Sequence, residues 1–512
     1  MAEGRPPDPT QGGVELAVYS VTILTDSLEQ VSALRGRRLD LHERAARRRP
    51  DSGDYAVPAV LSEDQITQLR SDGYRVVVHD DADQLAIARS AEVSPEVNRL
   101  APGSRDGSED RDGGASLRTA PDEQGSAAGE VLERLMDLSD PNQSATRGGE
   151  PREAGEQAVY GGYLTPDEVE SALHVLAATH VGAASVVELP ERTWGGAASH
   201  VLRLRAGQKE TRTGVLITGG VHAREWGGSD ICVAFATNLL RSYGAGAPLR
   251  YGNKTFASED VRAILENLDV FVVADVNPDG KAYSQSADPG QPRNFWWRKN
   301  RRLADMPSGA AGVDLNRNFD FLWSSGIGTE SDPTQFTYKG PAVFSEPEAR
   351  NVKWLLDSHF GISYFVDVHS FGELILFSWG DDENQFDVPD QNFLNPAFDG
   401  MRGVVGDSTY KEFIAGSDQA MLAELASGMN AALNDVRGKR YSVDQAVGLY
   451  PTSATSDDYA FSRQRVDPAR RKIYGFTIEF GQQFVPPHEE MRRIMADVAA
   501  GLTELCRVAA RD

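Results

Sequence analysis

Two histidines and a glutamate of this chain could bind a metal ion. His222-Ala-Arg-Glu225 comes just after the β-rich run 214–219, and His369 comes just after a second such run, 362–368. Polar groups just past the ends of parallel strands lie at the mouth of a crevice. Two imidazoles and one carboxylate that leave a fourth position open form a catalytic zinc set. A single H-x-x-E pair is common, however, so His222 taken alone also fits a strand-end histidine that is hydrogen-bonded to the backbone.

The segment that must position these side chains alternates short apolar runs with helical segments. Thr165-Pro-Asp-Glu168 combines an N-cap threonine with proline at the first helical position, and it predicts a helix through about Thr179. Near-continuous apolar strands suit a sheet that is buried on both faces. We therefore predict an α/β catalytic domain at 157–512, with a mixed, mainly parallel sheet covered by helices on both faces. Its strands are expected at 214–219, 268–274, 362–368 and 474–480.

The N-terminal part of the chain predicts a separate, smaller unit. Residues 14–90 contain apolar runs at 14–24, 56–61 and 76–78, a charged segment with helical spacing at 27–48, and a capping box at Ser62-Glu-Asp-Gln65. We interpret this stretch as a small α/β domain. Residues 1–13 are predicted to be a disordered tail, and residues 91–156, which are rich in small and charged residues, a flexible linker.

Several further elements follow the first histidine in a fixed order, and the whole series resembles the zinc metallocarboxypeptidases, the family of the digestive carboxypeptidases A and B. The resemblance covers roughly residues 157–512. Each element is weak alone, but a chance run in this order is very improbable. The series runs through Asn277-Pro-Asp-Gly280, Trp297-Arg-Lys-Asn-Arg301, Val313-Asp-Leu-Asn-Arg-Asn-Phe319, Val368-His-Ser370, Leu449-Tyr450 with Thr455-Ser-Asp-Asp458, and Phe476-Thr-Ile-Glu-Phe480.

The resemblance implies a metal centre and a catalytic base. His222, Glu225 and His369 match the family's ligands for one Zn²⁺, and Asp314 matches the carboxylate that orients the first histidine. Glu479 matches the general base that takes a proton from the attacking water and passes it to the leaving amine.

The resemblance also implies how a substrate is held. Arg301 matches the cation that stabilises the tetrahedral oxyanion. Asn316 and Arg317 match the pair that grips the free α-carboxylate of the substrate, a task that suits the planar guanidinium fork. Tyr450 matches the mobile tyrosine that closes over the C-terminal residue. The expected substrates are therefore the C-termini of peptides or proteins.

Asp457 matches the floor of the pocket for the C-terminal side chain, and an acidic floor suggests Lys or Arg substrates. An alternative is that Asp457 or Asp458 simply caps a helix that starts near Tyr459. The long segment 380–448, rich in Asp and Asn, departs from the simplest members of the family, so the loops around the pocket are expected to differ from theirs.

Composition excludes several other classes of protein. The 512 residues carry 52 Lys and Arg against 76 Asp and Glu, a net charge of −24, which argues against a nucleic-acid or anionic-membrane partner. Cys232 and Cys506 are too few and too far apart for a disulfide scaffold, and Cys232 is expected to be a buried apolar residue. Neither an export signal nor a membrane-spanning run is visible, so the sequence favours a cytoplasmic location.

Three hypotheses about function remain open at this level. The leading one is a zinc exopeptidase that hydrolyses the C-terminal peptide bond, with a possible preference for Lys or Arg. A second is an amidase or carboxypeptidase of the same superfamily that acts on cell-wall peptides. A third is a module that binds C-termini without cleaving them, which an intact Glu479 speaks against. The unit at 14–90 is either an inhibitory propeptide or a permanent accessory domain.

Overall fold

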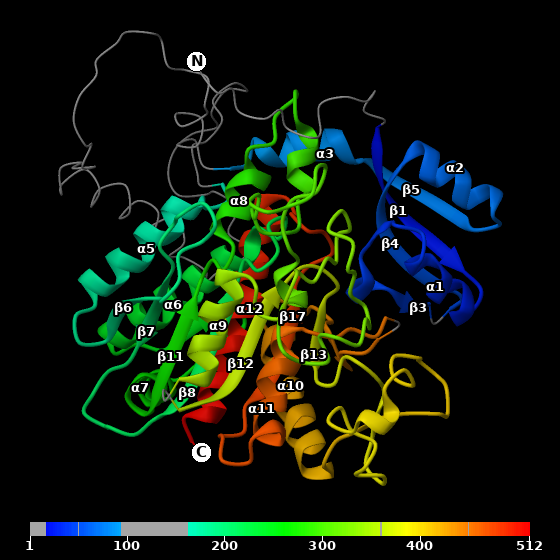
Figure 1. The fold of residues 1–512 in the computed structure, drawn as a ribbon. Coiled ribbons are helices and arrows are strands. Elements are labelled where there is room, and N and C mark those ends of the chain that lie inside the picture. Colours follow the sequence, from blue (N-terminus) through cyan, green and yellow to red (C-terminus); the bar gives the residue numbers. More distant parts are fainter. Residues whose placement is uncertain (1–16, 50, 94–161, 359–360, 449, 512) are drawn as a thin grey trace.

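The computed structural model describes residues 17–49, 51–93, 162–358, 361–448 and 450–511, which form a small N-terminal unit and a large α/β unit (Figure 1). The tail predicted at 1–13 and nearly all of the linker predicted at 91–156 lie outside the described residues. None of the helices in the described part of the chain is both long and apolar enough to cross a membrane.

The N-terminal unit is a sheet with strand order β2-β4-β1-β5, with β3 also paired to β4. Helices α1 and α2 cover one face, where Val31 and Ile66 pack among the inward side chains of β1 and β4. The predicted capping box at Ser62 and Gln65 is present at the start of α2. The elements are β1 (Val18–Thr25), α1 (Leu28–Arg35), β2 (Asp40–Leu41), η1 (Glu43–Ala45), β3 (Arg47–Arg48), β4 (Tyr55–Ser62), α2 (Glu63–Ser71), β5 (Arg75–Asp81) and α3 (Ala82–Ser90).

The prediction of helical structure over 27–48 is only partly right, because α1 ends at Arg35. The residues that follow have few apolar side chains, so a longer helix would have little to bury. Instead, β2 adds to the edge of the sheet through the pairs Asp40 with Val60 and Leu41 with Ala59. The turn η1 then brings a charged loop to the surface of the large unit.

The large unit is built on an eight-stranded sheet with the order β16-β13-β17-β12-β8-β11-β7-β6. The pairs between β17, β12, β8 and β11 are parallel, whereas β7 pairs antiparallel with β11 and β6, and β13 with β17. The predicted mixed, mainly parallel sheet is confirmed, and its four predicted strands match within one residue. Two separate two-stranded sheets, β9 with β10 and β14 with β15, also belong to the large unit. The strands of the large unit are β6 (Ala184–Glu188), β7 (His200–Leu204), β8 (Thr213–Gly219), β9 (Leu249–Tyr251), β10 (Lys254–Phe256), β11 (Leu268–Val273), β12 (Ile362–His369), β13 (Leu374–Phe377), β14 (Asn384–Gln385), β15 (Glu412–Phe413), β16 (Ser442–Gln445) and β17 (Tyr474–Glu479).

Helices cover both faces of this sheet, as predicted (Figure 1). Helices α6 and α12 pack together against β8 and β11, and α11 packs against β12 and β17 on the other face. Helix α5 begins with the predicted cap, in which Thr165 and Glu168 satisfy each other's backbone N–H groups. Cys232 is fully buried in α6, as expected. The helices are α5 (Pro166–Thr179), α6 (Gly227–Ala245), α7 (Ser258–Asn267), α8 (Pro278–Gln285), α9 (Pro347–Asp357), α10 (Gly416–Asp435), α11 (Ser456–Val466) and α12 (His488–Ala509), with the 3-10 turns η3 (Pro292–Trp296), η4 (Leu315–Arg317) and η5 (Pro396–Phe398).

The fold brings three parallel strand ends to one edge of the sheet. Strand β8 ends at Gly219, three residues before His222, and β12 and β17 end at His369 and Glu479, which face each other in register. Strand direction and register therefore gather side chains that are more than 250 positions apart in the sequence. This edge is where ligands bind in open α/β sheets.

Candidate active site

The three predicted metal ligands converge in a buried cluster. Nδ1 of His222 lies 2.8 Å from Oε1 of Glu225, and Nδ1 of His369 lies 3.0 Å from Oε2 of Glu225 and 3.1 Å from Nδ1 of His222. In a tetrahedral zinc site with bonds of about 2.0 Å, neighbouring ligand atoms are roughly 3.3 Å apart. The spacing and chemistry of the donors therefore fit a zinc ion that binds at the point where these atoms meet.

Each histidine has a carboxylate partner behind it. Oδ1 of Asp314 lies 3.3 Å from Nε2 of His222, and Oδ2 of Asp367 lies 3.0 Å from Nε2 of His369. Such partners fix the tautomer and the orientation of a metal-binding imidazole. Asp314 was predicted for this role, whereas the sequence analysis missed Asp367. Its position two residues before His369, on the same strand, was the available signal, since alternate residues of a strand face the same side.

A buried arginine neutralises the first of these carboxylates. Nε of Arg298 donates a hydrogen bond of 3.0 Å to Oδ2 of Asp314. Burial works against the charged form of Asp314, but the charge of Arg298 and the contact with His222 outweigh it and hold the pKa of Asp314 below its ordinary value. Asp314 is therefore ionised at neutral pH and can orient His222.

Glu479 stands beside the cluster at the end of β17. It is 5% exposed, lies opposite His369 in the strand register, and lines the same cavity as His222 and Glu225. Burial raises the pKa of Glu479 to about 7, with His369 acting in the opposite direction. A carboxylate with a pKa near neutrality can both accept and return a proton.

The cavity in front of the cluster has a volume of about 350 Å³ and is lined partly by the N-terminal unit. The large unit contributes the metal-binding edge of the sheet together with a group of polar side chains. The N-terminal unit contributes the loop from α1 to η1, residues 35–45. The site is therefore enclosed between the two parts of the chain.

Comparisons with known proteins agree with this geometry. A sequence model of the zinc carboxypeptidase family matches residues 169–501, which is more than half of the chain. The chain belongs to the zinc carboxypeptidase family. Rat carboxypeptidase A1 is 28% identical over 59% of this chain and 60% of its own length, and carboxypeptidase B of Helicoverpa zea is 32% identical over 45% of this chain and 49% of its own length. The matches thus span 60% and 49% of the lengths of these two relatives, less than two thirds in both cases.

Two solved structures share the fold of this zinc carboxypeptidase family member. Thrombin-activatable fibrinolysis inhibitor superimposes with a TM-score of 0.61 at 17% identity, covering 97% of this chain and 100% of the other. Carboxypeptidase A from Helicoverpa armigera gives a TM-score of 0.63 at 18% identity, covering 98% of this chain and 99% of the other. Because the coverage is nearly complete, the likeness extends over the N-terminal unit of this chain.

Arg301 lies away from the carboxypeptidase cavity. Its guanidinium stacks 3.6 Å from the ring centre of Tyr283 and 4.9 Å from that of Trp297, and it does not line the cavity. Arg298, three residues earlier, lines the cavity instead. The structure therefore separates the predicted oxyanion-stabilising residue from the site and brings a different arginine of the same motif into it.

Asn316 and Arg317 both line the cavity, as the resemblance implies. Asn316 accepts a hydrogen bond from the backbone N–H of Ser456, which fixes its amide. Arg317 donates to the backbone oxygens of Gly328 and Asn316 at 2.8 and 2.7 Å. Burial lowers the pKa of Arg317 to about 10, so the guanidinium remains charged at neutral pH.

Tyr450 is buried against the N-terminal unit and does not line the cavity. Its hydroxyl donates to the backbone oxygen of Val31 at 3.2 Å, and the guanidinium of Arg35 lies 4.8 Å from its ring centre. Its ring belongs to the apolar core of the N-terminal unit. The residue predicted to close over a substrate is therefore held by the N-terminal unit.

Asp457 is fully buried in the first turn of α11, which begins at Ser456 rather than near Tyr459. Its Oδ1 accepts from the backbone N–H of Asp458, and its Oδ2 accepts from Oγ1 of Thr477 at 2.9 Å. It does not line the cavity described above. The structure thus places this carboxylate inside the first turn of a helix, next to a second buried acid.

Two further buried acids lie near Asp457: Asp458, which the sequence analysis considered only as a helix cap, and Asp381, which it did not single out. Burial and the adjacent Asp457 raise the pKa of Asp458 to about 8. The pKa of Asp381 is raised by burial and by the charges of Glu412 and Asp458. Such a group of buried acids is stabilised by any cation that comes near it.

Proposed function

We propose that this chain is a zinc-dependent carboxypeptidase that hydrolyses the C-terminal peptide bond of peptides or proteins. His222, Glu225 and His369 hold the metal, and Glu479 acts as the general base. The observation that carries the proposal is the convergence of these four side chains at one sheet edge, in a cavity that also contains Asn316 and Arg317.

The proposed mechanism uses the ordinary chemistry of this kind of site. When bound, zinc supplies a Lewis acid that polarises the scissile carbonyl and activates a water molecule. Glu479 accepts a proton from the attacking water and delivers it to the departing amine. Arg298 donates N–H groups to the oxyanion that develops on the former carbonyl oxygen, and Asp314 keeps this guanidinium oriented. Arg298 thus takes the role for which Arg301 was predicted.

Restriction to chain ends follows from the clamp formed by Asn316 and Arg317. A guanidinium can donate to both oxygens of a free α-carboxylate, and that group exists only at a C-terminus. Tyr450 would cover the bound residue once it is released from the N-terminal unit. A peptide with a C-terminal amide offers Arg317 no charge to pair with, and it should therefore be a poor substrate.

We propose a preference for C-terminal Lys or Arg on electrostatic grounds. Asp457, Asp458 and Asp381 form a buried acidic group behind the clamp. A cationic substrate side chain would relieve the repulsion between these carboxylates. Arg44 of the N-terminal unit already acts in this way, because its charge lowers the pKa of Asp458.

We also propose that the N-terminal unit restrains the enzyme. Glu43 and Arg44 of η1 lie in the cavity beside Arg317 and Glu479, and the buried pair between Asp40 and Arg224, at 2.5 and 2.9 Å, fixes η1 there. A carboxylate and a guanidinium are the two charged groups that a C-terminal arginine would present. The loop therefore occupies the space that such a substrate needs.

The proposal is tested by assaying the full chain, before and after limited trypsin cleavage within the arginine-containing segment 94–161. The substrates are hippuryl-Arg, hippuryl-Lys, hippuryl-Phe, the C-terminal amide of hippuryl-Arg, and a peptide ending in a D-amino acid. We expect release of Arg and Lys from the free acids, loss of activity with a chelator, and recovery with Zn²⁺.

Equal cleavage of the amide would contradict the carboxylate clamp. Exclusive cleavage of the D-amino-acid peptide would favour a cell-wall substrate. Binding of the free acids without any turnover would favour a non-catalytic module.

A further inference from the structure

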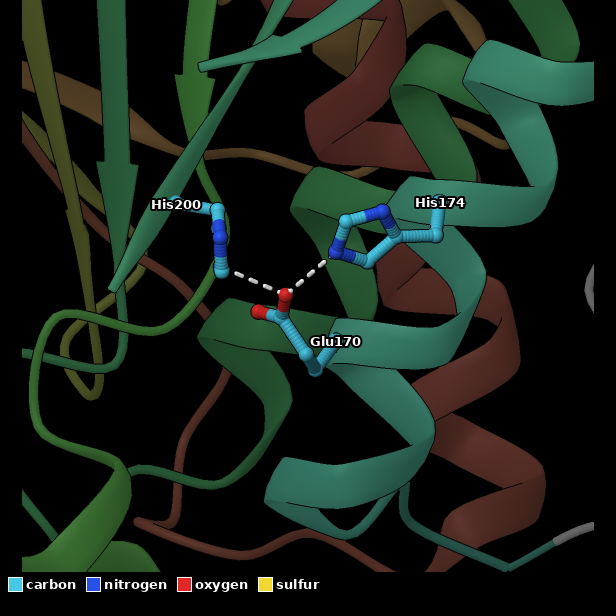
Figure 2. Close-up of side chains that lie close together, drawn as sticks. All are labelled: Glu170, His174 and His200. Atoms are coloured by element: carbon cyan, nitrogen blue, oxygen red, sulfur yellow. Dashed lines mark hydrogen bonds and ion pairs between the residues drawn. The ribbon is translucent and has the colours of Figure 1, made fainter. Parts of the chain in front are cut away.

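A second cluster of metal-binding side chains lies on the large unit, away from the proposed active site. Glu170 and His174 project from α5, and His200, at the start of β7, points toward them (Figure 2). Nε2 of His174 lies 2.8 Å from Oε1 of Glu170, and Nδ1 of His200 lies 2.6 Å from the same oxygen. One ligand atom from each residue falls within 4.8 Å of the others. The ligand atoms of the three side chains therefore converge on one point.

Local structure explains why these residues meet. Glu170 and His174 are four positions apart on α5, so they lie on the same face of the helix. The capping box at Thr165 fixes the start of this helix, and His200 pairs with Glu188 of β6 in the outermost part of the sheet, against which α5 packs. The arrangement is therefore built from regular elements rather than from a flexible loop.

We propose that Glu170, His174 and His200 form a second site for a divalent cation of the zinc class. Two imidazole nitrogens and one carboxylate oxygen are the same donor set as in the active-site cluster, and no residue is shared between the two. The side chains of His174 and Glu170 are 55% and 37% exposed, whereas that of His200 is 15% exposed. An ion can thus reach the site from solvent, and water can complete its coordination.

The contact between His200 and Glu170 supplies an independent indication. Nδ1 of His200 is buried and has, among the described residues, no partner with hydrogen-bond geometry, although Oε1 of Glu170 is only 2.6 Å away. A buried imidazole nitrogen that faces a carboxylate without a proper hydrogen bond lacks the partner that such a group normally has. A metal ion bound to both atoms would supply that partner.

The space beside the cluster adds a further acidic group. A cavity of about 320 Å³ is lined by Glu170, His200 and Asp275. Both carboxylate oxygens of Asp275 are buried without a hydrogen-bond partner among the described residues, and Lys281 is 3.9 Å away. The negative potential of Glu170 and Asp275 favours a cation at this place.

A cation at this second site would tie α5 to β7. Helix α5 is the first helix described after residues 94–161, and it covers the β6–β7 end of the sheet. A metal ion that bridges two elements adds its binding free energy to the stability of the folded state. The role we assign to this site is therefore structural and independent of peptide hydrolysis.

The test counts zinc ions on the full chain. The protein is stripped with a chelator, incubated with Zn²⁺, passed over a desalting column, and analysed for zinc per chain. We expect two ions in the native chain, one in His174→Ala, one in His369→Ala, and none in the double variant. His180→Ala is the matched control, because it removes a histidine at the end of the same helix and should leave two.

A titration of His369→Ala with Zn²⁺ isolates the second site. In this variant, the additional change Glu170→Gln removes one ligand of the second site. We expect zinc binding to weaken by at least roughly 10- to 100-fold, which is the usual effect of losing a residue that hydrogen-bonds to a metal ligand. If the native chain retains one zinc ion, or if His174→Ala retains two, the cluster is only a salt bridge between α5 and β7. Hydrolysis by His174→Ala should equal that of the native chain, so this result does not depend on the proposed active site.

Discussion

Oε2 of Glu43 in the N-terminal unit lies 3.7 Å from Nη2 of Arg317 in the large unit. The other carboxylate oxygen of Glu43 accepts a hydrogen bond of 2.9 Å from Arg35, which holds it in place. Arg317 is the residue proposed to bind the α-carboxylate of a substrate. A carboxylate from the same chain therefore already lies beside the clamp.

This relationship predicts that loosening the N-terminal loop raises activity. The double change Glu43→Ala and Arg44→Ala removes both charged groups from the cavity. We expect kcat/KM of the uncleaved chain to rise at least about tenfold, because a tenfold change corresponds to a loss of only about 1.4 kcal/mol from the interaction between the loop and the cavity. Steady-state hydrolysis of hippuryl-Arg by the uncleaved chain measures this rise in kcat/KM.

Arg37→Ala is the control for general damage to the N-terminal unit, because Arg37 pairs with Asp72 within that unit. Its activity should equal that of the native chain. Unchanged activity in the double variant, together with no gain on trypsin cleavage, would make the N-terminal unit an accessory domain.

Arg298 and Arg301 offer a matched pair of substitutions within one motif. Arg298→Gln removes a cation from the cavity, so we expect kcat to fall by roughly 10²- to 10³-fold, as when one oxyanion donor is lost. Arg301→Gln removes the stack on Tyr283 and Trp297, and because Arg301 does not line the cavity, kcat should stay within about twofold of the native value. Steady-state kinetics on hippuryl-Arg compare the two, and the reverse ranking would restore the role first predicted for Arg301.

The buried acids behind the clamp predict the side-chain preference. Asp457→Asn keeps an acceptor for Oγ1 of Thr477 but removes one negative charge. We expect the ratio of kcat/KM for hippuryl-Arg over hippuryl-Phe to fall at least about tenfold, which corresponds to about 1.4 kcal/mol. An unchanged ratio would mean that this carboxylate only stabilises the first turn of α11.

A buried glutamate that does not line the cavity predicts how stability depends on pH. Burial raises the pKa of Glu348 to about 8, and Nδ2 of Asn300 donates to its Oε2, while Oε1 has no hydrogen-bond partner in the part of the chain that the structure describes. Because the folded state binds this proton more tightly than the unfolded state, the contribution is fully present below the unfolded pKa and is lost as the pH rises toward 8. The free energy of unfolding should fall by up to about 1.4 kcal/mol per pH unit in this window.

Glu348→Gln should remove that part of the slope, because the amide keeps an acceptor and carries no charge. Chemical denaturation at pH 5.5, 6.5 and 7.5 measures the free energy of unfolding of both proteins. Parallel curves for the native chain and the variant would show that Glu348 does not titrate between the two states.

Much of the fold was predictable because its signals are local. The caps at Ser62 and Thr165 depend on side chains three positions apart, and the central strands are continuous apolar runs. The metal-binding cluster was predictable because His222, Glu225 and His369 stand directly after, or at the end of, such strands. Each of these signals, a helix cap or the end of an apolar strand, lies within a few consecutive residues of the sequence.

The contacts between the two units could not be predicted in the same way. The burial of Tyr450 depends on Val31 and Arg35, which lie more than 400 positions earlier and carry no pattern that links them to it. The choice between Arg298 and Arg301 depends on irregular backbone after η3, where no helical or strand period tells which side chain turns inward. Long-range docking and irregular backbone therefore mark the boundary of what the sequence alone could predict.

The central claim is that Glu479 performs proton transfer beside a zinc ion held by His222, Glu225 and His369. The most direct measurement is the hydrolysis of hippuryl-Arg by trypsin-cleaved Glu479→Gln, together with its zinc content. We predict that kcat falls by at least roughly 10²- to 10⁴-fold, the usual contribution of a general base, while the zinc content equals that of the native chain. Turnover at the native rate with zinc fully bound would contradict the account.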